Sequence, residues 1–116
     1  MDCIFCRIIN GEIPSAKVYE DDEVLGIRDI NPQAPVHIVF MPKKHVMSSL
    51  NDINENNQYL MGKIMSAIKI TADKLGLKNG YRVIINCGED AGQTVKHIHC
   101  HLLGGIQMGE DFFPHM

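Results

Sequence analysis

The sequence predicts one domain that combines β-strands with helices, and three observations support this prediction. Histidine and apolar residues alternate from His97 to Leu102, as side chains alternate between the two faces of a β-strand. Apolar residues recur at helical spacing over residues 54–75. The chain has 116 residues, which suits one domain with a modest core, so residues 1–116 are expected to form a single domain.

The first half of the chain predicts a helical turn followed by three strands. The turn opens at Cys3 and ends at Asn10-Gly11, because glycine commonly stops a helix. Short strands are expected over residues 17–20 and 24–28, on either side of a turn of three acidic residues. Prolines mark residues 31–35 as a loop, and the apolar residues 36–41 predict a central strand.

The second half predicts a long helix and a hairpin. The helix over residues 54–75 closes at Gly76, and its methionine-rich stripe is typical of a core-facing surface. Residues 81–86 predict a strand, and residues 87–94 predict a loop that leads into the strand of histidines. The two strands would form an antiparallel hairpin, which places Asn86 near the start of the histidine row.

The composition is that of an ordinary soluble protein, with 45% apolar and 22% charged residues. The net charge of −3 argues against duplex nucleic acid or an anionic membrane as a partner. No run approaches the roughly 20 apolar residues of a membrane span, and the N-terminus does not resemble a signal peptide. We therefore expect a cytoplasmic protein whose four cysteines are thiols or metal ligands.

His97, His99 and His101 share one face of the predicted strand, and three interpretations of this row compete. It could be a solvated row with no role, a shared zinc site, or a nucleophilic centre. Strand residues four apart lie roughly 13 Å apart at about 3.3 Å per residue. Since Zn–N bonds are about 2.0–2.1 Å long, two of the rings could share a zinc ion but three could not do so easily. A neutral imidazole is also a good nucleophile toward phosphorus near neutral pH, provided that a partner fixes its tautomer.

Cys3 and Cys6 form a C-x-x-C pair that could hold half of a zinc site. No second pair follows, so other residues would have to complete the site. His45 and His97 are available for a Cys₂His₂ set. The alternative is that both cysteines are small buried thiols.

The row His97-Ile98-His99-Cys100-His101-Leu102-Leu103 resembles the signature of the histidine-triad (HIT) superfamily, in which three histidines alternate with apolar residues. Further segments resemble the Hint branch of that superfamily, the purine nucleoside phosphoramidate hydrolases: Ile4-Phe5-Cys6-Arg7-Ile8-Ile9, Gly11-Glu12-Ile13-Pro14, Pro42-Lys43-Lys44-His45, Gly80-Tyr81-Arg82 and Leu103-Gly104-Gly105. The resemblance implies an α+β, HIT-like fold, in which an antiparallel sheet is combined with one long and one short helix. It also implies a homodimer that joins two sheets into a larger continuous one.

Carried over position by position, the resemblance makes His99 the nucleophile that attacks the α-phosphorus of a purine nucleotide, giving a nucleotidyl-histidine that water hydrolyses. His101 would support the phosphate charge, and His37 would orient His99, although a histidine among apolar residues is by itself typical of a core. Asn86 and Thr94 would hold the phosphate and the leaving group. The remaining nucleotide-binding positions are Asp29 for the ribose, Ile27, Ile4, Phe5 and Ile8 around the base, and Gly92, Gln93 and Val95 beside Thr94.

The resemblance also bears on the metal and on the choice of reaction. It supports a structural zinc at Cys3, Cys6, His45 and His97, whereas catalysis requires no metal or other cofactor. Asn86 fits the Hint branch, but Thr94 replaces the serine typical of Hint proteins and is shared with the Fhit branch, which cleaves dinucleoside polyphosphates. Two alternatives therefore stay open: a dinucleoside polyphosphate hydrolase, and a nucleotide-binding or scaffold protein whose hydrolysis is incidental.

Overall fold

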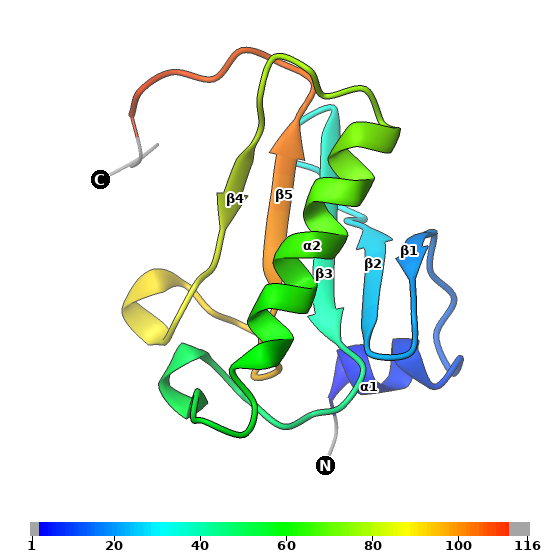
Figure 1. The fold of residues 1–116 in the computed structure, drawn as a ribbon, viewed down its shortest axis with the longest axis vertical. Helices are drawn as coiled ribbons and strands as arrows, with labels where there is room; N and C mark the ends of the chain where they lie inside the picture. The colour runs from blue at the N-terminus through cyan, green and yellow to red at the C-terminus, as the bar shows by residue number, and fades with distance from the viewer. Residues whose placement is uncertain (1–2, 112–116) are drawn as a thin grey trace.

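A five-stranded sheet forms the centre of the computed structural model, which describes residues 3–111 (Figure 1). Its strands are β1 (Lys17–Glu20), β2 (Val24–Arg28), β3 (Val36–Pro42), β4 (Arg82–Ile84) and β5 (Cys100–Gly104). They follow the order β1-β2-β3-β5-β4, and every neighbouring pair is antiparallel. The expected α+β fold is confirmed, as is the hairpin of β4 with the strand of histidines. β3 and β5 are the central strands, so they can bring distant residues together.

The two helices cover opposite faces of the sheet. The long helix α2 (Tyr59–Lys74) runs along one face, where its buried residues pack against Val24, Ile38, Phe40, Cys100 and Leu102 (Figure 1). The short helix α1 (Ile4–Ile9) covers one end of the other face, where Ile8 packs with Leu25, Ile27, Val39 and Met41. The remainder of that second face is therefore available for polar side chains.

The long helix begins at Tyr59, five residues later than the sequence suggested. Asn54 explains the difference, because its side-chain oxygen accepts hydrogen bonds from the main-chain N–H groups of Asn56 and Asn57, at 2.8 and 3.0 Å. Asparagine commonly closes such turns with its own side chain, in competition with a helix. A short 3₁₀ turn, η1 (Leu50–Asp52), precedes this segment.

The strand of histidines also begins later than predicted, at Cys100 rather than at His97. In the register of β3 with β5, Phe40 lies opposite Cys100, so that Ile98 would lie opposite Pro42. Proline has no N–H group to donate to the carbonyl of Ile98, and the carbonyl of Pro42 accepts a hydrogen bond from Nε2 of His97 at 2.7 Å. Ile98 donates its N–H to the carbonyl of Met47 instead, at 3.0 Å. The alternation of faces nevertheless holds, because Ile98, Cys100 and Leu102 are all buried on the α2 side.

Among residues 3–111, no helix is both long and apolar enough to span a membrane.

Candidate functional site

The polar site lies on the sheet face opposite α2, beside the end of α1. In the register of β3 with β5, His37 pairs with Leu103 and His101 with Val39, so the two histidines are diagonal neighbours on one face. The rings of His99 and His101 lie edge to face, with centroids 5.2 Å apart. Phe5 of α1 closes the other side, since its ring lies 4.9 Å from that of His99. The face that the alternation predicted for these histidines is therefore the face that carries the site.

A main-chain carbonyl fixes the tautomer of His99. Nδ1 of His99 lies 2.8 Å from the carbonyl oxygen of His97. A carbonyl only accepts hydrogen bonds, so the proton of the neutral ring must be on Nδ1. Nε2 then has a free lone pair, which is the form that a nucleophilic imidazole needs.

A second main-chain group fixes the tautomers of His37 and His101. The N–H of Gln33 donates to Nδ1 of His37 at 3.0 Å, so the proton of a neutral His37 is on Nε2. Nε2 lies 2.9 Å from Nδ1 of His101 and donates to it. Nδ1 of His101 is thereby an acceptor, and the proton of His101 is on Nε2. His101 can therefore donate a hydrogen bond at the same face where His99 presents a lone pair.

Burial keeps this histidine pair neutral at pH 7. Burial, together with the neighbouring rings of His99 and His37, lowers the pKa of His101 to about 4, although the carboxylate of Asp29 opposes that shift. Burial also lowers the pKa of His37, although the carboxylate of Asp29 opposes that shift. Oδ2 of Asp29 lies 3.4 Å from Nε2 of His37, and its Oδ1 accepts the N–H of Asn31 at 2.8 Å. The structure thus places Asp29 behind His37, a contact that the sequence did not predict.

The loop before β5 carries the remaining predicted phosphate-binding residues. It contains the 3₁₀ turn η2 (Glu89–Ala91) and bends at Gly92, whose φ of +77° favours glycine. Asn86 donates to the carbonyl of Ala91 at 2.8 Å, which ties the end of β4 to this turn. Thr94 is exposed at the loop surface.

Gln93 has a different position from its neighbours, because its side chain is buried beneath the loop. Its Oε1 accepts the N–H of Gly88 at 2.9 Å, and its Nε2 donates to the carbonyls of Ser48 and Val95 at 2.6 and 2.9 Å. Gln93 therefore holds the loop shape from within. No signal in the sequence distinguished this role from direct contact with a nucleotide.

The predicted base-pocket residues come from α1 and β2. Ile8 and Ile27 are buried in one apolar cluster, and Phe5 packs against it. Ile4 is 48% exposed and lines a cavity together with Thr94 and Val95. The structure thus brings an apolar surface of α1 next to the loop that carries Thr94.

Cys3, Cys6, His45 and His97 converge beside the site, as the zinc prediction required, and their ligand atoms all lie within 4.8 Å of one another. The sulfur of Cys3 lies 3.4 Å from Nδ1 of His97, and that of Cys6 lies 3.3 Å from Nδ1 of His45 and 3.6 Å from Nδ1 of His97. A tetrahedral zinc with Zn–S of about 2.3 Å and Zn–N of about 2.0–2.1 Å would set sulfur and nitrogen about 3.5 Å apart. The four residues therefore fit a structural zinc ion.

The surroundings of His97 also suit a metal ligand. Its Nε2 donates to the carbonyl of Pro42 at 2.7 Å, which leaves the lone pair on Nδ1, the atom that faces the sulfurs. Burial lowers the pKa of His97 to about 4, so the ring is neutral and able to ligate. The interpretation of Cys3 and Cys6 as unrelated buried thiols does not explain this arrangement.

Asp29, His37 and His101 form a second cluster whose ligand atoms lie equally close together, but its hydrogen bonds do not suit a metal. The N–H of Gln33 occupies the Nδ1 lone pair of His37, so the Nε2 that faces the cluster carries a proton. A protonated nitrogen has no lone pair for a cation. This cluster is a chain of hydrogen bonds that ends at His101.

Comparisons with known proteins agree with the fold and with the metal cluster. Residues 2–111 match the family model described as scavenger mRNA decapping enzyme C-term binding. The chain is 50% identical over 106 residues to the 14 kDa zinc-binding protein of Zea mays, covering 90% of this chain and 83% of that protein.

Solved structures extend the likeness to three dimensions. The HIT family hydrolase from Clostridium thermocellum Cth-393 is 48% identical, covers 97% of both chains and superposes with a TM-score of 0.93. A Zn-bound histidine triad family protein from Mycobacterium smegmatis is 34% identical, covers 95% of this chain and 79% of its own, and has a TM-score of 0.78. The similar proteins thus include one named for zinc binding and one crystallised with zinc.

Proposed function

This chain belongs to the histidine-triad (HIT) family, and we propose that it is a hydrolase that cleaves purine nucleoside phosphoramidates into the nucleoside monophosphate and an amine. The observation that carries the proposal is the 2.8 Å contact between Nδ1 of His99 and the carbonyl of His97. It leaves Nε2 of His99 as a free nucleophile on the open face of the sheet. The hydrolases among the similar solved structures support the reaction class.

The reaction has two steps. In the first, the Nε2 lone pair of His99 attacks the α-phosphorus, the P–N bond breaks, and the leaving nitrogen takes a proton from solvent to depart as the amine; the second step returns a proton to solvent. In the second, water attacks the nucleotidyl-histidine, which releases the nucleoside monophosphate and restores the lone pair of His99. Proton donation to the leaving nitrogen is essential, because an unprotonated amide anion is a very poor leaving group.

The histidine pair supplies charge stabilisation at the phosphate. Since His37 donates to Nδ1 of His101, the Nε2–H of His101 is free to donate to a phosphate oxygen. A donor held in place before the reaction stabilises developing charge without reorganisation. We assign His37 as a positioning residue that acts through His101, which differs from the orientation of His99 that the family resemblance implied.

The other site residues would bind the nucleotide. Asn86 and the exposed hydroxyl of Thr94 lie at the loop that would hold the phosphate and the leaving group, together with the main chain of Gly92 and Val95. The carboxylate of Asp29 would accept hydrogen bonds from the ribose hydroxyls, with lone pairs that its contacts with His37 and Asn31 leave unused. Phe5, Ile8, Ile27 and the half-exposed Ile4 would form the apolar surface for the base.

The metal cluster would hold a zinc ion that keeps α1 attached to the loop before β5. Zinc bound by two thiolates and two imidazoles has no open position for substrate, so it supplies structure rather than chemistry. Its ligands Cys3 and Cys6 lie on either side of Phe5, the residue whose ring contacts His99. The ion would thereby support one wall of the site.

A homodimer is also part of the proposal. β4 is an edge strand of the described sheet. Val83 within it is 36% exposed, and Tyr81, which precedes it, is 40% exposed. Ile106, which follows β5, is 62% exposed. An edge strand with apolar neighbours is a ready template for pairing with a second copy. Sedimentation equilibrium of the wild type and of Val83→Lys tests this, since the variant is expected to shift the protein toward monomer.

The experiment that tests the reaction compares wild type with His99→Ala on adenosine 5′-phosphoramidate of lysine. The variant should lose nearly all turnover while it still binds AMP, because only the nucleophile is removed. Near-normal rates in the variant would show that His99 is not the nucleophile. Rates on diadenosine triphosphate, measured with the same preparation, decide whether the activity is instead that of a dinucleoside polyphosphate hydrolase. Binding of AMP without turnover on either substrate would favour a nucleotide-binding or scaffold protein.

A further inference from the structure

A cavity of about 520 Å³ opens beside the loop that precedes β5. Its lining comes from Cys3, Ile4 and Arg7 at α1 and its N-terminal cap, from His45, and from Thr94, Val95 and Lys96. The cavity therefore adjoins the surface proposed for the base, through Ile4, and the metal cluster, through Cys3 and His45. Thr94 and Val95 therefore belong both to this cavity and to the loop assigned to the phosphate. A group attached to that phosphate could extend directly into the cavity.

The cavity is basic although the protein as a whole is acidic. Among residues 3–111 its lining includes Lys96 and Arg7 but no carboxylate, whereas the chain has a net charge of −3. Arg7 forms an ion pair with Glu12, whose Oε1 lies 3.9 Å from Nε of Arg7. Within the described part of the chain, Lys96 makes no hydrogen bond or ion pair, so its ammonium group is available to a ligand.

We propose that this cavity receives the leaving group and selects leaving groups that carry negative charge, such as amines with a carboxylate. The inference rests on the proposed function, because it places the α-phosphate at Thr94. Lys96 would be the main determinant of this preference, and Arg7 would add to it. A neutral or cationic leaving group would gain nothing from either side chain.

The expected size of the effect follows from the exposure of these cations. Both side chains are exposed, so each contact with a ligand carboxylate is weakened by water and by salt. Removing one such charge should change the preference by about 2- to 5-fold, and reversing it should have a larger effect. The preference should also shrink as the ionic strength rises.

A matched pair of substrates tests the inference. The adenosine 5′-phosphoramidates of β-alanine and of β-alanine amide have leaving groups of equal length and differ in one negative charge. The measured quantity is the ratio of kcat/KM for the anionic substrate to kcat/KM for the neutral one. Comparing this ratio between protein variants cancels the difference in intrinsic reactivity between the two substrates.

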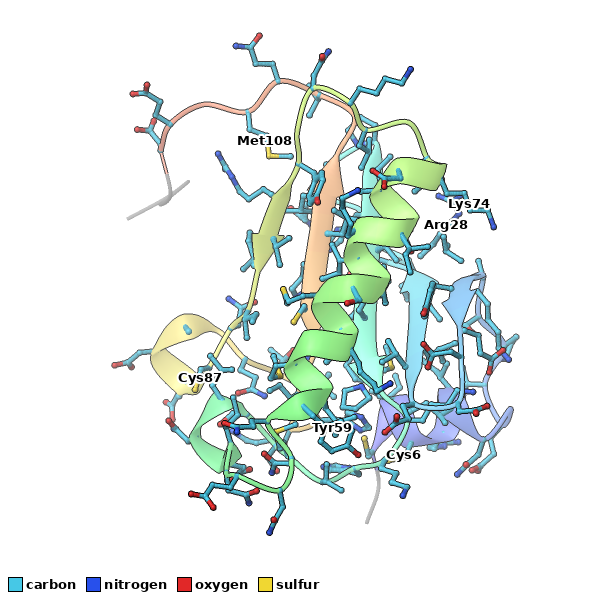
Figure 2. All side chains as sticks on the ribbon, viewed as in Figure 1. Cys6, Arg28, Tyr59, Lys74, Cys87 and Met108 are labelled. Carbon is cyan, nitrogen blue, oxygen red and sulfur yellow. The ribbon has the colours of Figure 1, made fainter. Side chains whose placement is uncertain are left out.

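Lys96→Gln should lower the ratio by about 2- to 5-fold and Lys96→Glu should lower it further. The matched control is Lys74→Gln, which removes a lysine from the last turn of α2, at the opposite end of the molecule from α1 and Cys6 (Figure 2). Its ratio should equal that of the wild type. An unchanged ratio in Lys96→Glu would overturn the inference while leaving the proposed hydrolase intact. If wild type hydrolyses neither substrate, the proposed function fails and the inference fails with it.

Discussion

Replacing His37 tests whether the chain of hydrogen bonds behind His101 matters for turnover. In the structure, the N–H of Gln33 donates to His37, and His37 donates to Nδ1 of His101 at 2.9 Å. His37→Phe keeps a flat ring in a position that is only 7% exposed, but it removes the donor. Nδ1 of His101 is then left without its partner, and the ring can turn or change its tautomer.

The magnitude follows from the cost of an unmade buried hydrogen bond, about 1–3 kcal/mol. If that energy is lost from the transition state, kcat should fall by about 5- to 150-fold. His37→Gln is the matched control, because its amide N–H can donate to His101 and its oxygen can accept the N–H of Gln33. We expect the glutamine variant to recover a large part of the lost rate.

The assay is steady-state hydrolysis of an adenosine phosphoramidate, together with the affinity for AMP. Since His37 acts through His101, the loss should be in kcat, while AMP binding should change little. Nitrogen NMR shifts of the His101 ring report its tautomer directly, and they should change in His37→Phe but not in His37→Gln. Equal kcat for phenylalanine and glutamine variants, with the His101 tautomer unchanged in both, would refute the reasoning.

Three further predictions concern stability. Burial holds the folded-state pKa of His101 at about 4, below the 6.5 of an exposed histidine, so the unfolded chain takes up this proton first. The free energy of unfolding should therefore fall by about 1–2 kcal/mol as the pH drops from 6.5 toward 4, and urea titrations should show a smaller fall in His101→Gln. Metal analysis of the purified protein should find one zinc ion per chain. Cys6→Ser should remove the zinc and lower the melting temperature by about 10 °C, whereas Cys87→Ser should change neither the zinc content nor the melting temperature. Gly26→Ala should cost about 1–3 kcal/mol in urea unfolding, because the added Cβ would meet Cε2 of Phe40 at 2.7 Å; an unchanged midpoint would contradict this.

The sequence predicted the faces of the sheet better than the ends of its elements. Alternation from His97 to Leu102 depends only on the extended backbone, so the two sets of side chains are separated as expected. The start of β5 depends instead on the partner strand, where Pro42 lacks an N–H group. The start of α2 depends on a side-chain turn at Asn54. The apolar periodicity of β5 does not show the effect of Pro42, and that of α2 does not show the effect of Asn54.

Within the candidate site too, some features could be predicted from the sequence and others could not. Cysteine and histidine are a recognisable set of zinc ligands, so the residue types allowed the metal cluster and the family resemblance indicated it, even though Cys3 and His97 lie 94 positions apart. The tautomers could not be predicted, because they are set by main-chain groups of Gln33 and His97 whose positions depend on the folded loops. The same holds for Gln93, whose amide could equally have faced a ligand. Chemistry that depends on residue type is readable in the sequence, whereas chemistry that depends on a main-chain contact is not.

His97 joins the metal cluster to His99, the proposed nucleophile, through two different parts of one residue. Nε2 of its ring donates to the carbonyl of Pro42 and Nδ1 is left for the cluster, while its main-chain carbonyl accepts a hydrogen bond from Nδ1–H of His99. Phe5 makes a second link, because it lies between Cys3 and Cys6 in the chain and its ring touches both His97 and His99. A zinc ion that fixes the His97 ring would therefore also fix the carbonyl that selects the His99 tautomer. His97 would thus hold the metal cluster together and, through its carbonyl, prepare His99 for the proposed reaction.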